Sequence, residues 1–327
     1  MLRTRILGTG AHAPDKILTN ADLEKMVETS DAWIRERTGI VERRIAAPHE
    51  ASSDIALVAA ENALSNAGIT AAELDLIIVA TVTPDAPLPS CAAYVQAKLG
   101  AKNAFAFDLV AACAGSLYAM SVADQFVKTG KVKRALVIGV ELLSRIVDWS
   151  DRNTCVLFGD AAGAMVLGPG DDADRGILST HLYLDGTAAG ILHIPGGGTR
   201  MPASPEVLEQ KLNKVHMNGR EVYKFAVRAL TDAVRTALAE NGLQASQVDH
   251  VVAHQANLRI IEAVMQRLEL PMERCHLNLA RYGNTSSASV PMTLDEANRA
   301  GLLAPGDVIA MMAIGAGMAW GSAIVRW

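Results

Sequence analysis

The sequence has few aromatic residues and no concentration of charge of one sign. Aromatic side chains make up 4% of its 327 residues, and 30 basic residues are interspersed with 35 acidic ones, for a net charge of −5. This distribution lacks the overall basic patch that nucleic acid or an anionic membrane surface requires. No apolar run approaches the ~18 residues of a membrane span, and the run near the N-terminus is too short for a signal peptide. We expect a globular protein that binds neither nucleic acid nor membrane.

Cysteine is also scarce. The four cysteines are far apart and form no CxxC pair; they are Cys91, Cys113, Cys155 and Cys275. Such a pattern encodes no metal cluster and suits free thiols in a reducing compartment, so we predict a cytoplasmic protein without a metal site. Half of the residues are hydrophobic, which is enough for one large core or for two domains of about 150 residues each.

One of these cysteines, Cys113, lies where a predicted buried strand gives way to a helix. Residues 104 to 110 are apolar apart from one Asp, and from Leu117 onward apolar residues recur at helical spacing. Small neighbours leave the sulfur open to a substrate, and a helix N-terminus lowers the pKa of a thiol. The pattern predicts a nucleophile, although a small buried hydrophobe would fit the same position.

The chain contains an internal repeat. Residues 56 to 83 and residues 230 to 254 each read as a helix, a Gly stop, a short polar link and an apolar strand. At a constant offset of 174 residues, five positions are identical: Ala63, Leu64, Gly68, Ala71 and Asp75 match Ala237, Leu238, Gly242, Ala245 and Asp249. The likeness continues at a slightly shorter offset, so the sequence predicts a duplicated α/β unit with buried strands.

The predicted boundary between the halves lies in GPGDDADRG at residues 168 to 176, whose composition is typical of a connection. We therefore divide the chain into an N-terminal half, 1–170, and a C-terminal half, 171–327. Residues 194 to 205 read as a long loop, which would either cap a site or form a plain surface insertion. Ligands usually bind where the strand ends of two such units meet.

Two further polar residues end predicted strands or turns of the second half. His254 lies in VVAHQANLRI and Asn284 in RYGNTSSASVP. If the halves pack as pseudo-symmetric partners, the Cys113 turn and the Asn284 turn are equivalent, and all three side chains can face one cavity. A thiolate, a proton-exchanging imidazole and an amide donor together suit acyl transfer. Singly, the histidine would fit a core position and the asparagine a turn.

Motifs along nearly the whole chain carry a resemblance to a known family. They are TSDAWIRERTGIVERR, DLVAACAGSLYA, FGDAAGAMVLG, VVAHQANLRI, GNTSSASVP and GAGMAWGSAIVRW. In order and spacing they resemble β-ketoacyl-acyl-carrier-protein synthase III, the initiating condensing enzyme of bacterial fatty acid synthesis. The resemblance implies a five-layered αβαβα thiolase-like fold, a homodimer, acyl-CoA and malonyl-acyl carrier protein as substrates, and no cofactor.

The resemblance also implies roles for the three polar residues. Cys113 would take the acyl group from acyl-CoA, while His254 and Asn284 would stabilise the enolate that forms as malonyl-acyl carrier protein loses carbon dioxide. Backbone N–H groups of Cys113 and Ala316 would form the oxyanion hole, although the family usually has Gly at position 316. Elongating condensing enzymes resemble a Cys, His, His set and thiolases a Cys, His, Cys set, so Asn284 favours the priming type.

Binding residues follow from the same resemblance. Those implied for CoA are Thr29, Trp33, Arg37, Arg152, Gly219 and Asn257. An indole and guanidinium groups suit a purine and phosphates, but the segment around Trp33 also fits an amphipathic helix with a solvated basic face. Those implied for the acidic carrier protein are Lys224, Gln255, Arg259 and Arg267, with Arg228 and Arg235 on the same predicted helix face as Lys224. Each of these charges would also fit a solvated surface.

Two departures from the family concern the acyl pocket. Leu88 and Ile314 stand where the family often has Phe, and the residue at position 88 would reach across the dimer into the partner's pocket. The shorter side chains leave the primer open to longer or branched acyl groups. The alternatives are a related acyltransferase of secondary metabolism with another primer or acceptor, a hydrolase with the same three residues, and a non-catalytic subunit, which would be expected to lack Cys113.

Overall fold

The computed structural model describes residues 3–170, 172 and 174–327. Within these residues the chain forms two five-stranded sheets of matching topology, each with parallel strands at one edge and antiparallel strands at the other. The first sheet has the order β1-β7-β6-β4-β5, with β1 Arg3–His12, β7 Asp160–Gly170, β6 Ala135–Leu142, β4 Leu76–Ala80 and β5 Phe105–Leu109. The second has the order β12-β11-β13-β14-β8, with β12 Cys275–His276, β11 His250–Ala253, β13 Val308–Gly315, β14 Ala319–Arg326 and β8 Gly176–Leu184.

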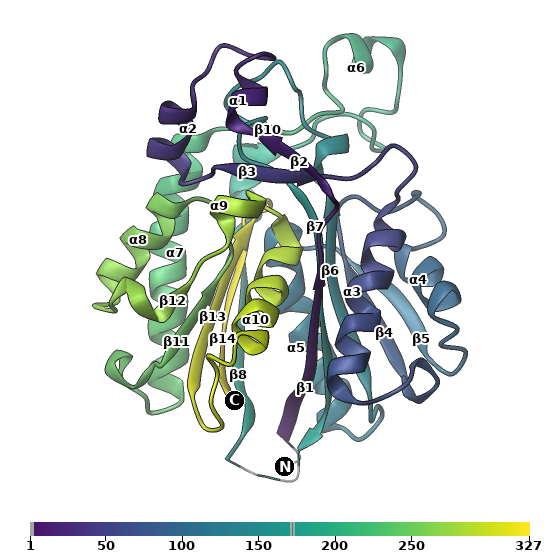
Figure 1. Cartoon of the computed structure of the whole chain (residues 1–327), viewed down its shortest axis with the longest axis vertical. Coiled ribbons are helices and arrows are strands. Elements are labelled where there is room, and N and C mark those ends of the chain that lie inside the picture. Colours follow the sequence, from purple (N-terminus) through teal and green to yellow (C-terminus); the bar gives the residue numbers. More distant parts are fainter. Residues whose placement is uncertain (1–2, 171, 173) are drawn as a thin grey trace.

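Helices lie between the two sheets and on both outer faces, which gives five layers (Figure 1). The central layer consists of α5 Gly115–Lys128 and α10 Ser289–Arg299, each of which contacts strands of both sheets. The outer layers are α3 Ser52–Ala67 and α4 Cys91–Leu99 on the first sheet, and α7 Gly219–Glu240 with α8 Leu258–Arg267 on the second. This architecture confirms the layered α/β fold predicted from the sequence.

The internal repeat appears in the structure down to its capping interactions. Gly68 and Gly242 follow α3 and α7 with φ of 68° and 65°, a left-handed conformation that glycine adopts without steric cost. The links after them form the 3-10 turns η1 Ala71–Glu73 and η5 Ala245–Gln247, and in each turn the side chain of the last residue accepts from the backbone N–H of the residue before the turn. Asp75 and Asp249 then accept backbone hydrogen bonds from the segments that lead into β6 and β13.

The duplicated turns at the ends of the parallel strands refine this picture. Ala112 and Ser286, 174 residues apart, begin the 3-10 turns η2 Ala112–Ala114 and η7 Ser286–Ala288 with φ of 45° and 50°. The structural counterpart of Cys113 is therefore Ser287, and Asn284 comes three residues before it. The predicted equivalence of the two turns is therefore right for the loops, but Asn284 itself does not occupy the position that corresponds to Cys113.

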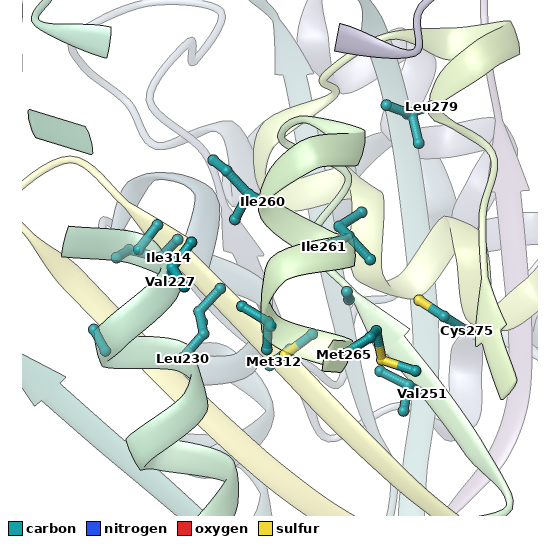
Figure 2. Packing of buried hydrophobic residues seen from close by; sticks show 14 of the residues in the cluster. Val227, Leu230, Val251, Ile260, Ile261, Met265, Cys275, Leu279, Met312 and Ile314 are labelled. Atoms are coloured by element: carbon teal, nitrogen blue, oxygen red, sulfur yellow. The ribbon is translucent and has the colours of Figure 1, made fainter. Parts of the chain in front are cut away.

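Apolar packing fixes the layers of the second half (Figure 2). Helices α7 and α8 bury aliphatic side chains against β11 and β13, in one cluster that includes Val227, Leu230, Val251, Ile260, Ile261, Met265, Met312 and Ile314. Each fully buried aliphatic side chain contributes roughly 1.5–3 kcal/mol. All eight residues of β13 are buried, so the position of the strand end beside the site is set by the core.

Smaller elements cover one end of the sheets, opposite the two termini (Figure 1). They are β2 Lys16–Thr19, α1 Asn20–Leu23, α2 Asp31–Thr38, β3 Glu42–Ile45, η3 Leu143–Arg145, η4 Gly186–Ile191, β9 Leu192–His193, α6 Pro205–Glu209, β10 His216–Met217 and α9 Leu279–Tyr282. The remaining short turn, η6 Met272–Arg274, precedes β12. The predicted boundary at 168–176 includes positions 171 and 173, which lie outside the described residues. Over the described ranges, no helix combines the length and apolar character needed to cross a membrane.

Candidate active site

Cys113, His254 and Asn284 line one cavity of about 990 Å³. Cys113 lies in η2 of the first half, His254 directly after β11, and Asn284 between α9 and η7. The backbone of Asn284 pairs with the first half: its N–H donates to Leu157 O at 2.8 Å, and its carbonyl accepts from Gly159 N at 3.0 Å. The two halves therefore meet at the cavity and bring the three predicted residues to it.

The nucleophile turn packs directly against the end of β13. A Cβ on Gly315 would overlap the backbone nitrogen of Cys113, so only glycine permits this approach. Ala316 is the next residue along the chain. The two residues whose backbone N–H groups are predicted to form the oxyanion hole, Cys113 and Ala316, therefore lie in adjoining segments. The Cys113 side chain is 7% exposed and, as the sequence predicts, precedes the first residue of α5 by two positions.

The surroundings of Cys113 raise the pKa of its thiol. Burial of the sulfur has the largest effect and raises this pKa to about 12; the Ser286 hydroxyl lowers it and the Glu141 carboxylate raises it by smaller amounts. The expectation of a lowered thiol pKa is therefore wrong, because burial of the sulfur dominates and disfavours the thiolate.

His254 borders the same cavity as Cys113. Burial lowers its pKa to about 3, so the imidazole is neutral at physiological pH. Its Nδ1 lies 2.7 Å from Ser289 Oγ. Nε2 has no partner in the described chain and is available to the cavity that His254 lines.

Asn284 is held so that its amide N–H₂ is the free end. The Ser286 backbone N–H donates to Asn284 Oδ1 at 2.9 Å, and among the described residues nothing accepts from Nδ2. The amide can therefore donate a hydrogen bond to an oxygen in the cavity, as the chemistry of an enolate or oxyanion requires.

Sequence reasoning missed the groups behind these side chains. Glu141, at the end of β6, is fully buried and accepts from the hydroxyls of Thr83, Ser286 and Ser287 at 2.8, 3.2 and 3.2 Å. Burial raises its pKa to about 7. The serines stand in the GNTSSAS motif and at the 174-residue offset from the nucleophile turn, a signal that could have identified them; nothing local marks Glu141.

The residues predicted to hold CoA lie around the cavity mouth. Trp33, Arg37, Gly219 and Asn257 line the cavity, and the guanidinium carbons of Arg37 and Arg152 lie 5.2 and 5.4 Å from the centre of the Trp33 ring. Asn257 begins α8 as its N-cap and donates to Arg37 O at 3.0 Å, joining the two segments. Thr29 lies outside the cavity lining, and its Oγ1 is buried with no hydrogen-bond partner in the described chain.

Two of the four residues predicted to contact a carrier protein lie at this mouth. Lys224 of α7 and Arg259 of α8 are exposed and line the cavity. Arg267 is exposed at the far end of α8, about 12 Å further along the helix at 1.5 Å per residue.

The prediction for Gln255 is wrong. Its side chain is 0% exposed and fully hydrogen-bonded: Nε2 donates to the carbonyls of Ala253 and His276, and Oε1 accepts from the N–H groups of Asn278 and Leu279. A carrier protein cannot reach this amide. Gln255 instead ties the His254 loop to the segment that leads to Asn284.

The two residues predicted for the acyl pocket lie in different surroundings. Ile314 is buried and lines the cavity. Leu88 is 87% exposed and lies outside the cavity of its own chain. The loop of residues 194 to 205 contributes no side chain to the described cavity lining, where Leu192 and Met217 border it instead.

Comparisons with known proteins give one answer. The model of 3-oxoacyl-[acyl-carrier-protein] synthase III matches residues 107–186, and the C-terminal model of the same family matches residues 238–327. A relative from Symbiobacterium thermophilum, named β-ketoacyl-[acyl-carrier-protein] synthase III, is 55% identical over 98% of this chain and 97% of its own.

Solved structures agree. The 3-oxoacyl-[acyl-carrier-protein] synthase III of Aquifex aeolicus is 46% identical with a TM-score of 0.92, covering 99% of this chain and 100% of that one. A priming β-ketosynthase of a polyketide biosynthetic pathway is 35% identical with a TM-score of 0.92, covering 99% and 96%. The resemblance seen in the sequence is confirmed: the chain belongs to the 3-oxoacyl-[acyl-carrier-protein] synthase III family.

Proposed function

We propose that this chain catalyses the decarboxylative condensation of an acyl-CoA primer with malonyl-acyl carrier protein, giving a β-ketoacyl-acyl carrier protein and starting fatty acid synthesis. Membership of the family supports the reaction. The observation that carries the assignment of residues is that Cys113, His254 and Asn284 line one cavity at the junction of the two halves. We also keep the division into halves, 1–170 and 171–327, as part of the proposal.

In the first step the Cys113 sulfur attacks the thioester carbonyl of acyl-CoA. The carbon–sulfur bond to CoA then breaks, and the thiol proton of Cys113 passes to the departing CoA sulfur. Backbone N–H groups of Cys113 and Ala316 stabilise the tetrahedral oxyanion, and loss of one such donor costs about 3 kcal/mol. Burial disfavours the imidazolium, so His254 stays a neutral ring.

In the second step the malonyl thioester carbonyl accepts hydrogen bonds from Asn284 Nδ2–H and His254 Nε2–H. Carbon dioxide leaves, the enolate carbon attacks the acyl carbonyl on Cys113, and the carbon–sulfur bond of the acyl enzyme breaks. The Cys113 sulfur then recovers its proton from solvent. These steps use no metal or cofactor.

Substrate binding follows the mouth of the cavity. Trp33, flanked by Arg37 and Arg152, suits the purine and phosphates of CoA, with Thr29, Gly219 and Asn257 nearby. Lys224 and Arg259 suit an acidic carrier protein, and Arg228, Arg235 and Arg267 lie further along the same two helices. The four free, buried cysteines suit a reducing cytoplasm.

We propose a homodimer through β5. This strand is at the edge of the first sheet, and large apolar side chains are exposed beside it: Leu88, Phe105 and Val110. An exposed apolar edge strand pairs readily with another chain, and Leu88 would then reach the partner's acyl pocket. Sedimentation should give about twice the 34.6 kDa of one chain, and Val110→Glu should lower that mass; a monomeric wild-type protein would reject the dimer.

Intact-mass spectrometry tests the reaction directly. Incubation with a panel of acyl-CoA thioesters, from acetyl to longer and branched chains, should add one acyl group, and Cys113→Ala should remove the adduct. Malonyl-acyl carrier protein should then yield carbon dioxide and a β-keto product. No adduct with any thioester, or an adduct that persists in Cys113→Ala, would reject the mechanism. Rapid hydrolysis without condensation would assign a hydrolase instead, and the preferred thioester would identify the primer that Leu88 and Ile314 admit.

A further inference from the structure

Arg43 of β3 is a buried cation. Its side chain is 0% exposed, and although burial lowers the pKa of its guanidinium to about 10, the group stays charged at neutral pH. The neighbouring Glu42 pairs with Arg44 instead, at 3.5 Å. Nη1 of Arg43 donates to Asn20 Oδ1 at 2.8 Å, and Nη2 donates to Val156 O at 2.7 Å. Burying a charge is costly unless its hydrogen bonds are made, and because Val156 lines the cavity, these bonds fix Arg43 to the cavity wall.

Asn20, the first residue of α1, connects Arg43 to α2. Its side chain is 1% exposed. While its Oδ1 accepts from Arg43, its Nδ2 donates to Asp31 Oδ1 and to Ile40 O, both at 2.8 Å. Asp31 is the first residue of α2, and Ile40 follows Gly39, the C-cap of that helix. Asn20 therefore contacts the chain at both ends of α2.

The chemistry of its partners allows the Asn20 amide only one orientation. The Arg43 guanidinium can only donate, and the Ile40 carbonyl can only accept. Hydrogen bonds from Arg35 and Asn20 lower the pKa of the Asp31 carboxyl, so Asp31 is an anion at neutral pH and also accepts. The amide therefore lies between a cation and an anion, an arrangement in which each hydrogen bond strengthens the other.

Helix α2 carries two of the residues at the cavity mouth. Trp33 and Arg37 line the cavity, and the guanidinium carbon of Arg37 lies 5.2 Å from the centre of the Trp33 ring. Asn20 and Arg43 are not among the described residues of this lining, so they act on a ligand only through α2. We propose that Asn20, anchored by Arg43, is a positioning residue that holds α2 in place for binding the nucleotide end of acyl-CoA. The proposal rests on the proposed function, which places CoA at this mouth.

A thioester without the nucleotide separates this role from a general loss of structure. An N-acetylcysteamine thioester carries the acyl group on the sulfur end of CoA alone. In Asn20→Ala, the acyl-CoA concentration that gives half-maximal acylation of Cys113 should rise on the order of tenfold, with the maximal rate unchanged. Acylation by the N-acetylcysteamine thioester should match that of the wild type. Arg43→Met removes the donor to Asn20 and should raise the same concentration; no rise would reject Arg43 as the anchor.

Asn241→Ala is the matched control. Asn241 is the C-cap of α7, and its Nδ2 also donates two hydrogen bonds, to Ser179 Oγ at 2.6 Å and to Ala237 O at 2.7 Å. It lies at the opposite end of α7 from Gly219, which lines the cavity. The variant should lose stability, as Asn20→Ala does, and keep wild-type acylation by both thioesters.

Hydrogen exchange measured without ligand reports on the helix itself. Amides of α2 should exchange faster in Asn20→Ala, on the order of tenfold, and at the wild-type rate in Asn241→Ala. Asp31→Ala removes the same link from the exposed side of α2 and should act in the same direction, which keeps the test decisive if Asn20→Ala does not fold. Arg35→Ala breaks only the exposed ion pair with Asp31, at 2.7 Å, and should have little effect.

Three results would overturn the proposal: α2 exchange that is unchanged in both Asn20→Ala and Asp31→Ala, a half-maximal acyl-CoA concentration that does not rise in them, or acylation that is impaired equally with both thioesters. If the wild type takes no acyl group from acyl-CoA, the proposed function fails instead, and the exchange rates still decide whether Asn20 holds α2.

Discussion

The turn that carries Cys113 and its counterpart in the second half have the same backbone and different tasks. Both begin with a residue at φ near 50°, Ala112 and Ser286, and both lead directly into a helix of the central layer. Cys113 borders the cavity, whereas Ser287 is buried and hydrogen-bonded to Ala80. The duplicated fold thus supplies one turn that is open to substrate and one that supports the first.

The difference lies in what each turn faces. Each packs its backbone against a glycine of the other half: Gly315 accommodates Cys113, and Gly139 of β6 accommodates Ser287. Beyond Gly315 the chain ends its strand and the cavity begins, whereas Gly139 lies within a strand whose residues are all buried. The same turn is reactive only where the neighbouring strand stops.

Moving the thiol from one turn to the other is the severest test of this comparison. In the double variant Cys113→Ser with Ser287→Cys, acyl transfer should fall on the order of a thousandfold or more, because the thiol at position 287 is buried away from the cavity. Intact-mass spectrometry after incubation with acyl-CoA measures the adduct. Ser287→Cys alone, which keeps Cys113, should still take one acyl group. An adduct at position 287 would show that both turns are open.

Much of this comparison could be predicted from the sequence, because the repeat is visible at positions where the local backbone requires a particular residue type. Gly68 and Gly242 end helices in the left-handed region, and Asp75 and Asp249 accept backbone hydrogen bonds from the residues that lead into β6 and β13. Had the offset of 174 residues been kept through the nucleophile turn, it would have placed Ser287 opposite Cys113; the slightly shorter offset predicted there pointed to Asn284 instead. The carrier-protein contact predicted for Gln255 is wrong, although its polar side chain follows the histidine in a motif. The structure shows that its amide is hydrogen-bonded to backbone groups. Glu141 was invisible for the same reason: its hydrogen-bond partners come from two distant segments, 81–83 and 286–287.

Replacing Glu141 by Gln should change how the stability of the chain depends on pH. The pKa of Glu141 is about 7 in the folded chain against an ordinary value of 4.5, so the folded state holds the proton more tightly. Its contribution to stability is complete below pH 4.5 and is lost as pH rises through 7. Relative to the wild type, the free energy of unfolding of Glu141→Gln should therefore rise across this window by up to about 3 kcal/mol.

Urea unfolding at several pH values between 4.5 and 8 measures this difference. The titration of His254 is common to both proteins and cancels, and the changed hydrogen bonds to Ser286 and Ser287 give an offset that does not vary with pH. Alkylation of Cys113 should also become faster in the variant, because the carboxylate that raises the pKa of the thiol is gone. If the free energies of unfolding of the two proteins differ by the same amount at every pH, the raised pKa of Glu141 is contradicted.

Substituting the two glycines breaks each turn in the same way. Gly315→Ala and Gly139→Ala each place a methyl group on the backbone of the opposite turn, and overpacking of this kind costs about 1–3 kcal/mol. Both should lower Tm by a similar amount. Acylation should be lost in Gly315→Ala, whose clash is at the Cys113 nitrogen, and largely kept in Gly139→Ala. Equal losses of acylation would mean that the two turns move as one unit.

The smallest expected difference is between the two capping aspartates. Asp75 Oδ2 accepts from the N–H groups of Lys133 and Arg134, at 2.7 and 3.0 Å, whereas Asp249 Oδ2 accepts only from Val308 N, at 2.8 Å. Each hydrogen bond is worth about 1 kcal/mol, so Asp75→Ala should destabilise the chain by about 1 kcal/mol more than Asp249→Ala in urea unfolding. Both lie at the end of the sheets away from the cavity, because each precedes the strand that runs toward it, and acylation rates should be unchanged. A larger loss in Asp249→Ala would mean that the second half depends on its single bond more than the first depends on two, and that the halves, though alike in backbone, are not equally stable.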